Sequence, residues 1–347
     1  MLSPLRTTTR SLFALGVSLV VPCAWSESAP TQLTGSHDVV FSDYSPLSSN
    51  AELARRLLTP LEAARIPQLL AHSGDHLSEQ PINLSEEKFV LYVPTQAPAR
   101  GYALLVFVPP WPDARLPEGW SSVLDRYGFI FVSAAHSGND ASPLGRRAPL
   151  ALLAAHNIMR RYAVDAERVY IGGFSGGSRT ALRLALGYPD VFRGALLNAG
   201  SDPIGNADRP LPQRDLFLRF QDSTRLVYIT GEEDSVSRGM DAQSTHSMWD
   251  WCVFDIDTEV TFRAGHELVT PVALAKALRA LLNPVAPDRE KLATCRSGIE
   301  MKLSAQLEQV QSLIAAGKHD DAQKLLHQID TRFGGLAAPR SLDLDRQ

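Results

Sequence analysis

This sequence of 347 residues has few cysteines, lacks the common metal-binding patterns and has no large excess of either charge. Only three cysteines occur, and no C-x-x-C, H-E-x-x-H or other metal-ligand spacing is present, so we expect no metal site. The phosphate-binding patterns G-x-x-x-x-G-K-(S/T) and G-x-G-x-x-G are also missing, so we expect no nucleotide or other cofactor. A net charge of -4 points away from nucleic acid and anionic membranes as partners. What remains is the composition of a globular protein, with 44% hydrophobic and 21% charged residues.

Residues 1–26 have the pattern of a secretory signal peptide. Arg6 and Arg10 make the start positive, residues 11–21 are apolar, and Ala24-Trp25-Ser26 places small residues where a signal peptidase cleaves. Because the apolar run is too short to span a bilayer, we expect a secreted or periplasmic protein with no membrane span once the signal is removed. A retained anchor is the alternative, and Cys23 raises a lipoprotein reading that the proline before it disfavours.

The cysteines leave one question open. If Cys23 is removed with the signal, Cys252 and Cys295 remain as a pair. In an oxidising compartment such a pair can form a disulfide that joins two segments of the chain. Two buried free thiols fit the sequence equally well.

Segments typical of strands and helices alternate along the middle of the chain. Expected strands lie at 88–93, 103–108, 129–133, 168–174, 194–198, 226–230 and 259–262, with helices at about 118–127, 149–162 and 180–186. This alternation predicts an α/β fold with a mostly parallel central sheet and helices on both faces. Ligands of such sheets bind beyond the carboxyl ends of the strands.

The flanking segments differ from this core. The periodicity from Asn50 to Leu70 predicts one or two short helices, interrupted by prolines, and Glu27 to Ser36 is expected to be a loose leader. Beyond Pro287, two apolar stripes separated by Gly317 predict a helical hairpin that packs on the main domain or on a protein partner, followed by a frayed end from Ala337. We therefore expect a signal peptide at 1–26, a leader with helices at 27–85, the α/β domain at 86–286 and a C-terminal helical extension at 287–347.

A serine lies at the junction of one expected strand and the helix after it. Residues 173–177, Gly-Phe-Ser-Gly-Gly, fit G-x-S-x-G, the sharp turn that exposes a nucleophilic serine at the carboxyl end of a strand. A Cβ at Gly173 or Gly177 is expected to clash, because strand and helix approach closely there. A glycine-rich loop that matches by chance is the alternative, but the strand and helix on either side favour a catalytic Ser175.

A serine nucleophile needs a base and an acid, which in this kind of fold follow it in the order acid, then histidine. Asp234 and His266 each follow an expected strand through a short turn, so both are expected at the same rim as Ser175. His266 would accept the serine proton and Asp234 would orient the imidazole. The other candidates for the base are His136, His156 and His246, and those for the acid are Asp202, Glu232 and Glu233.

An oxyanion needs hydrogen-bond donors as well. The backbone N–H of Gly176 is expected to supply one donor and the loop after the strand 103–108 the other. Because Pro109, Pro110 and Pro112 lack an N–H, Trp111 is the expected second donor, with Asp113 as the other possibility. The Trp111 side chain would either line the pocket or pack in a corner.

The region from about Phe89 to Leu282 resembles the α/β-hydrolase superfamily, in particular secreted esterases of the feruloyl esterase and polyhydroxybutyrate depolymerase-like type. The resemblance rests on residues 162–177, 188–192, 231–234 and Gly265-His266. It implies a cofactor-free serine hydrolase that cleaves carboxylic esters, small or polymer-linked, outside the cytoplasm. The sequence departs from the family at the proline-rich loop around Trp111, where relatives have glycines, and at Ser178.

Other functions use the same framework. A peptidase or an acyltransferase would employ the same three residues, and a non-catalytic binding module could retain the fold. The resemblance favours the esterase.

Overall fold

The computed structural model describes Met1, residues 33–74 and residues 78–347. Apart from Met1, the expected signal peptide at 1–26, which includes Cys23, lies outside the described residues. Leu33–Gln347 form one compact unit. Within the described ranges, no helix combines the length and the apolar character that crossing a membrane would require.

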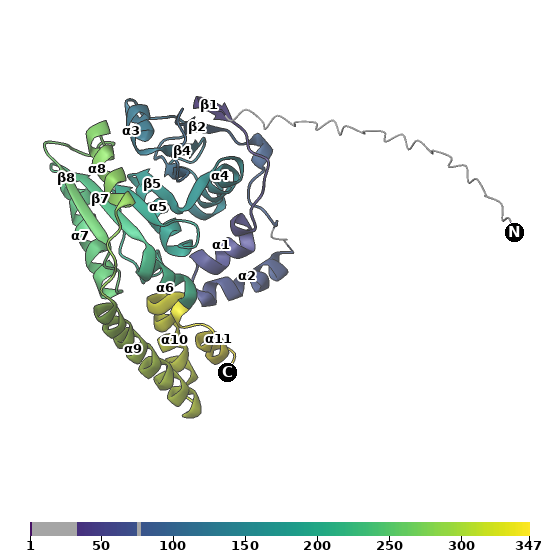
Figure 1. Cartoon of the computed structure of the whole chain (residues 1–347). Coiled ribbons are helices and arrows are strands. Elements are labelled where there is room, and N and C mark those ends of the chain that lie inside the picture. Colours follow the sequence, from purple (N-terminus) through teal and green to yellow (C-terminus); the bar gives the residue numbers. More distant parts are fainter. Residues whose placement is uncertain (2–32, 75–77) are drawn as a thin grey trace. The chain divides into compact units, whose positions relative to one another are not determined.

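An eight-stranded sheet forms the centre of this unit, in the order β1-β2-β4-β3-β5-β6-β7-β8 (Figure 1). The strands are β1 (Gly35–Val39), β2 (Phe89–Val93), β3 (Tyr102–Val108), β4 (Phe129–Ala134), β5 (Val164–Phe174), β6 (Gly194–Asn198), β7 (Arg225–Gly231) and β8 (Ile256–Thr261). β1 and β2 are antiparallel to their neighbours, and the other neighbouring strands pair in parallel. The predicted mostly parallel sheet is confirmed. The prediction of a loose leader is wrong at its end, because β1 begins at Gly35 and pairs with β2.

Helices cover both faces of the sheet. They are α1 (Asn50–Leu57), α2 (Pro60–Ser73), α3 (Trp120–Tyr127), α4 (Ala148–Arg161), α5 (Gly176–Gly187), α6 (Arg214–Ser223), α7 (Ser235–Asp250), α8 (Pro271–Leu282), α9 (Arg289–Ala315), α10 (His319–Phe333) and α11 (Arg340–Asp345). α3 and α8 pack on one face of the sheet, and α1, α4 and α5 pack on the other. All seven residues of β3 are buried, as a strand covered on both faces requires.

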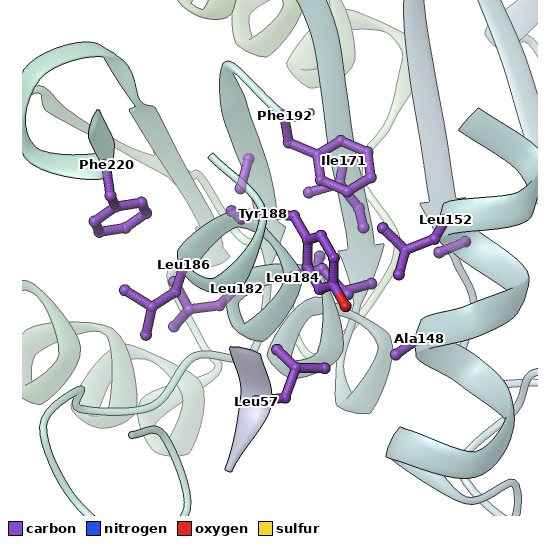
Figure 2. Packing of buried hydrophobic residues seen from close by; sticks show 14 of the residues in the cluster. Leu57, Ala148, Leu152, Ile171, Leu182, Leu184, Leu186, Tyr188, Phe192 and Phe220 are labelled. Carbon is purple, nitrogen blue, oxygen red and sulfur yellow. The ribbon is translucent and has the colours of Figure 1, made fainter. Parts of the chain in front are cut away.

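The helix that follows Ser175 is held by apolar contacts on its far end (Figure 2). Tyr188, just after α5, is fully buried beside Leu184 of α5, Leu57 of α1 and Leu152 of α4. Its hydroxyl donates to the carbonyl oxygen of Leu47 at 3.0 Å, so the one polar atom of this buried ring is satisfied. Packing of α1 and α4 therefore fixes the position of α5.

The expected C-terminal hairpin is formed by α9 and α10, which run side by side (Figure 1). It packs on the same unit: the ring of Phe333 lies edge-on to Trp251 at 5.7 Å, and the amide of Leu61 donates to Asp330 at 3.2 Å. The prediction of a frayed end is wrong, because Ala337 and Leu344 are buried and α11 forms around them. Apolar burial, which the sequence pattern did not reveal over so short a stretch, orders this segment.

A disulfide links Cys252, just after α7, to Cys295 in α9. Of the two alternatives left open by the sequence, the bonded pair is the one found in the structure. The bond ties the helical extension to the sheet domain across 43 residues of sequence.

We expect Cys295→Ala to lower the free energy of unfolding by about 2–4 kcal/mol, because opening a loop of this size enlarges the entropy of the unfolded chain. Denaturant titration followed by circular dichroism measures this change. Dithiothreitol should destabilise the unmodified protein by a similar amount and leave Cys295→Ala unaffected. Equal stability of the two proteins in the absence of reductant would contradict the expectation.

Candidate active site

Ser175 lies in a strained turn between β5 and α5. Its backbone has φ 54° and ψ −122°, a left-handed conformation that costs about 1–3 kcal/mol for a residue with a side chain. The turn is tight because glycines flank it: a Cβ on Gly173 would collide with the backbone of Gly177, and one on Gly177 with the carbonyl of Val108. The predicted steric role of these two glycines is confirmed.

Three side chains meet at the carboxyl ends of the strands. Nε2 of His266 lies 3.0 Å from Oγ of Ser175, and Nδ1 of the same ring lies 2.6 Å from Oδ2 of Asp234. Asp234 follows β7 and His266 follows β8, so parallel neighbouring strands bring them to one rim. His266 is about half exposed, at 48%, whereas the Asp234 side chain is 5% exposed. This is the order of contacts that a serine nucleophile, its base and an orienting acid need.

Asp234 is held as a carboxylate by its surroundings. Burial raises its pKa, but hydrogen bonds from Ser237 and from His266 lower it by more, so the pKa of Asp234 is below its ordinary value. The amide of Ser237, in the first turn of α7, donates to Oδ1 at 3.0 Å. Asp234 is thus the N-cap of α7, where the helix dipole also favours negative charge. Its other oxygen stays available to the imidazole.

The other candidates for base and acid lie elsewhere. Of the histidines, His246 pairs with Asp250 on the exposed side of α7, His156 lies within α4, and His136 follows β4. Of the acids, Asp202 forms ion pairs with two arginines, and Glu232 accepts a hydrogen bond from the backbone amide of Arg263. None of the hydrogen bonds described for these residues joins them to Ser175 or His266.

Trp111 does not line the pocket at Ser175. Its indole packs against Phe107 at 6.5 Å and Phe174 at 6.3 Å, and its buried Nε1 has no hydrogen-bond partner among the residues that the structure describes. Phe174 in turn lies against the ring of His266 at 5.1 Å. Trp111 therefore supports the site through Phe174, and its role as an oxyanion donor stays a prediction.

Asn139 is a residue of the site that sequence reasoning missed. It lines the same pocket as Ser175, and its carboxamide lies so close to Gly176 that a Cβ there would collide with it. The backbone N–H of Asn139 donates to the carbonyl of Pro110 at 3.0 Å, and this bond joins the loop after β4 to the loop after β3. In sequence Asn139 belongs to a Ser-Gly-Asn-Asp turn, and such a turn gives no sign of what it faces.

The pocket beside Ser175 has a volume of about 860 Å³. Its walls combine the start of α5 and the start of α7 with arginines from α5, from the short helical segment Pro143–Arg147 before α4, and from the loop after β6. Within the described ranges, no group of three or more histidine, cysteine or acidic residues is placed to hold a metal ion.

Strand order, the strained serine after β5, the acid after β7 and the histidine after β8 together define the architecture. The chain has the α/β-hydrolase fold. The turn at Ser175 resembles the one that holds the nucleophile in serine esterases of this fold.

Similarity to known proteins covers only part of the chain. No family model matches the chain. A poly(3-hydroxybutyrate) depolymerase of Ralstonia pickettii is 30% identical over 100 residues, which cover 24% of this chain and 20% of the depolymerase. The chain therefore matches only about a fifth of that relative's length.

Two solved structures are similar at lower identity. A ferulic acid esterase matches with a TM-score of 0.46 and 14% identity over 71% of this chain and 98% of its own. A thermostable esterase matches with a TM-score of 0.40 and 18% identity over 57% of this chain and 59% of its own.

We expect Gly177→Ala to prevent stable folding or to lower the free energy of unfolding by several kcal/mol, because the new Cβ meets the backbone of Val108 rather than a movable side chain. Gly239→Ala is the matched control: Gly239 lies in α7 with no atom near its missing Cβ, so alanine should stabilise that helix by up to about 1 kcal/mol. Thermal and denaturant unfolding measure both. Equal stability of the two variants would contradict the close approach at Gly177.

Proposed function

We propose that this protein is a serine esterase that hydrolyses carboxylic esters through an acyl-enzyme on Ser175, outside the cytoplasm. The observation that carries the proposal is the continuous chain of contacts from Ser175 Oγ to His266 Nε2 and from His266 Nδ1 to Asp234, at the mouth of a pocket. The polyester named in the depolymerase relative supports an ester rather than an amide as substrate. The signal-like start of the sequence and the disulfide support a location in an oxidising compartment.

In the first half of the reaction, His266 Nε2 takes the proton of Ser175 as Oγ bonds to the ester carbonyl carbon. The tetrahedral intermediate collapses, and His266 returns that proton to the departing alcohol oxygen as its bond to carbon breaks. Water then repeats the sequence on the acyl-enzyme, and the carboxylic acid leaves. Throughout, Asp234 holds the imidazole and stabilises its charged form.

The negative oxygen of the intermediate needs donors near the start of α5. The N–H of Gly176, first residue of α5, is one proposed donor, and the N–H of Trp111 remains the proposed backbone donor from the loop after β3. We assign a further donor to the side chain of Asn139, because the prolines at 109 and 110 remove two backbone N–H groups there. Its carboxamide lines the pocket beside Gly176 with Oδ1 nearer to that glycine than Nδ2, and Nδ2 is the atom proposed as the donor.

Ser175→Ala and His266→Ala should each lower kcat for p-nitrophenyl esters by about 10⁴–10⁶-fold, because nucleophile and base act as a unit. Unmodified protein should react with a fluorophosphonate at Ser175, and His266→Ala should react far more slowly. His246→Ala is the control, since that side chain is exposed on α7 and faces Asp250, and it should retain full activity. Hydrolysis of esters by folded Ser175→Ala at the unmodified rate would overturn the proposal.

Asn139→Ala should lower kcat by about 10- to 10³-fold with little change in KM, because a donor to the oxyanion acts in the transition state and not on bound ester. Asn139→Asp keeps the shape of the side chain but replaces the donor with a negative charge, so its loss should be at least as large. If Asn139→Asp were as active as the unmodified enzyme, the side chain would have a packing role only.

A further inference from the structure

Four arginines line the pocket beside Ser175: Arg147, Arg179, Arg183 and Arg209. The acidic residues in the same lining are Asp208 and Asp234, and Asp234 is engaged with His266. Positive charge therefore exceeds negative charge around a space of about 860 Å³ that opens on the nucleophile. An apolar acyl chain would not replace the water that an exposed part of a guanidinium binds in this pocket.

A single carboxylate serves two of these arginines. Asp202 accepts both Nε of Arg179, at 2.8 Å, and the guanidinium of Arg209. Among the described contacts, neither Arg147 nor Arg183 forms an ion pair with a carboxylate. Arg147 donates to the carbonyls of Ser137 and Pro109, at 2.9 and 3.0 Å, and is 4% exposed.

Arg183 has the fewest described hydrogen bonds of the four arginines. The bond goes from Nη2 to the carbonyl of Leu57 at 3.3 Å, while its buried Nε has no partner among the described residues. The buried Nε of Arg209 also has no partner in the described part of the chain. Burial, and then the neighbouring charge of Arg209, lower the pKa of Arg183 to about 10, and the nearby carboxylates Asp208, Glu62 and Asp202 do not offset this. Two neighbouring cations whose carboxylates do not fully offset burial are an arrangement that a bound anion would stabilise.

The helix α5 relates these charges to the nucleophile. Arg179 and Arg183 follow Ser175 by four and eight residues, so the three lie on one face of the helix. At about 1.5 Å per residue, the Cα atoms of Arg179 and Arg183 lie roughly 6 and 12 Å along the axis from Ser175. An ester bound at Ser175 would place a group several bonds away between the arginines.

We propose that this pocket selects esters that carry a carboxylate, with the carboxylate bound between Arg183 and Arg209 and the ester carbonyl at Ser175. The proposal rests on the ester hydrolysis proposed above. Guanidinium groups bind carboxylates through paired N–H donors, and both Arg183 and Arg209 line the pocket that opens on Ser175.

The test compares matched esters that differ only in charge. One pair places the charge on the acyl side, mono-p-nitrophenyl adipate against the p-nitrophenyl ester of adipamic acid. The other places it on the alcohol side, 4-acetoxybenzoate against 4-acetoxybenzamide. We expect kcat/KM to be about tenfold to a hundredfold higher for the acid in at least one pair at low salt, and the preference to shrink at high salt. Equal or lower kcat/KM for the acid in both pairs would overturn the proposal.

Variants locate the preference. Arg183→Gln should reduce the ratio of acidic to neutral kcat/KM by about tenfold or more, and Arg183→Lys should recover part of it because the charge returns. Arg126→Gln, an exposed arginine of α3 outside the pocket, should leave the ratio unchanged. A ratio unaltered in folded Arg183→Gln would overturn the assignment of this residue. If Arg183→Gln does not fold, the comparison of esters on the unmodified enzyme still decides.

A binding measurement separates this inference from the proposed activity. Calorimetry of Ser175→Ala with adipate should give binding that adipamide does not compete with, whether or not any ester is hydrolysed. Binding of adipate without ester turnover would remove the esterase and keep the anion site. Ester turnover with no charge preference and no adipate binding would remove the anion site and keep the esterase.

Discussion

The close approach of β5 and α5 around Ser175 is the constraint on which the site depends. A serine at φ 54° is unfavourable by itself, and the cost is met by the packing of the helix that begins immediately after it. Leu182 and Leu184 of α5 are fully buried against the core, and Tyr188 closes the far end of the helix (Figure 2). Because that packing fixes α5, a relaxed turn would move the helix out of its packed position. The serine hydroxyl therefore stays directed toward His266.

The turn is reinforced from a second strand. Ser178, which stands where the family pattern has glycine, is buried and donates to the carbonyl of Gly200 after β6. Gly200 must be glycine here, since a Cβ would lie 2.5 Å from the carbonyl oxygen of Ser175. Serine at position 178 thus gives the turn around Ser175 an additional hydrogen bond.

Much of the fold could be predicted because its signals are local. The apolar run of β3 and the strand, turn and helix around Ser175 lie within short windows, and their periodicity is enough to define them. Asp234 and His266 were candidates because each follows a strand of a parallel sheet, and parallel strands end at one edge. Their mutual distances, however, depend on sheet order, which no local pattern contains.

What sequence could not supply arises where distant segments meet. β1 reads as polar because it lies at the sheet edge with alternate residues exposed, so little apolar signal marks it. Asn139 becomes part of the site only because the loops after β3 and β4 are joined by a hydrogen bond. Arg209 meets Arg183 from a loop after β6, and this contact cannot be read from either segment alone.

The arginines of α5 show that one helix forms both the turn at Ser175 and a wall of the pocket. The helix α5 packs its apolar face on the core and so holds Ser175 in place. Its opposite face lines the pocket, where Arg179 and Arg183 follow Ser175 at intervals of four residues. Asp202 is a single carboxylate that Arg179 and Arg209 share, and Arg183 forms no ion pair among the described contacts, at some cost in stability. Stability sacrificed beside a nucleophile is characteristic of positions kept for ligand binding rather than for folding. In the proposed reaction, the same helix sets where the ester reacts and which charge its far end should carry.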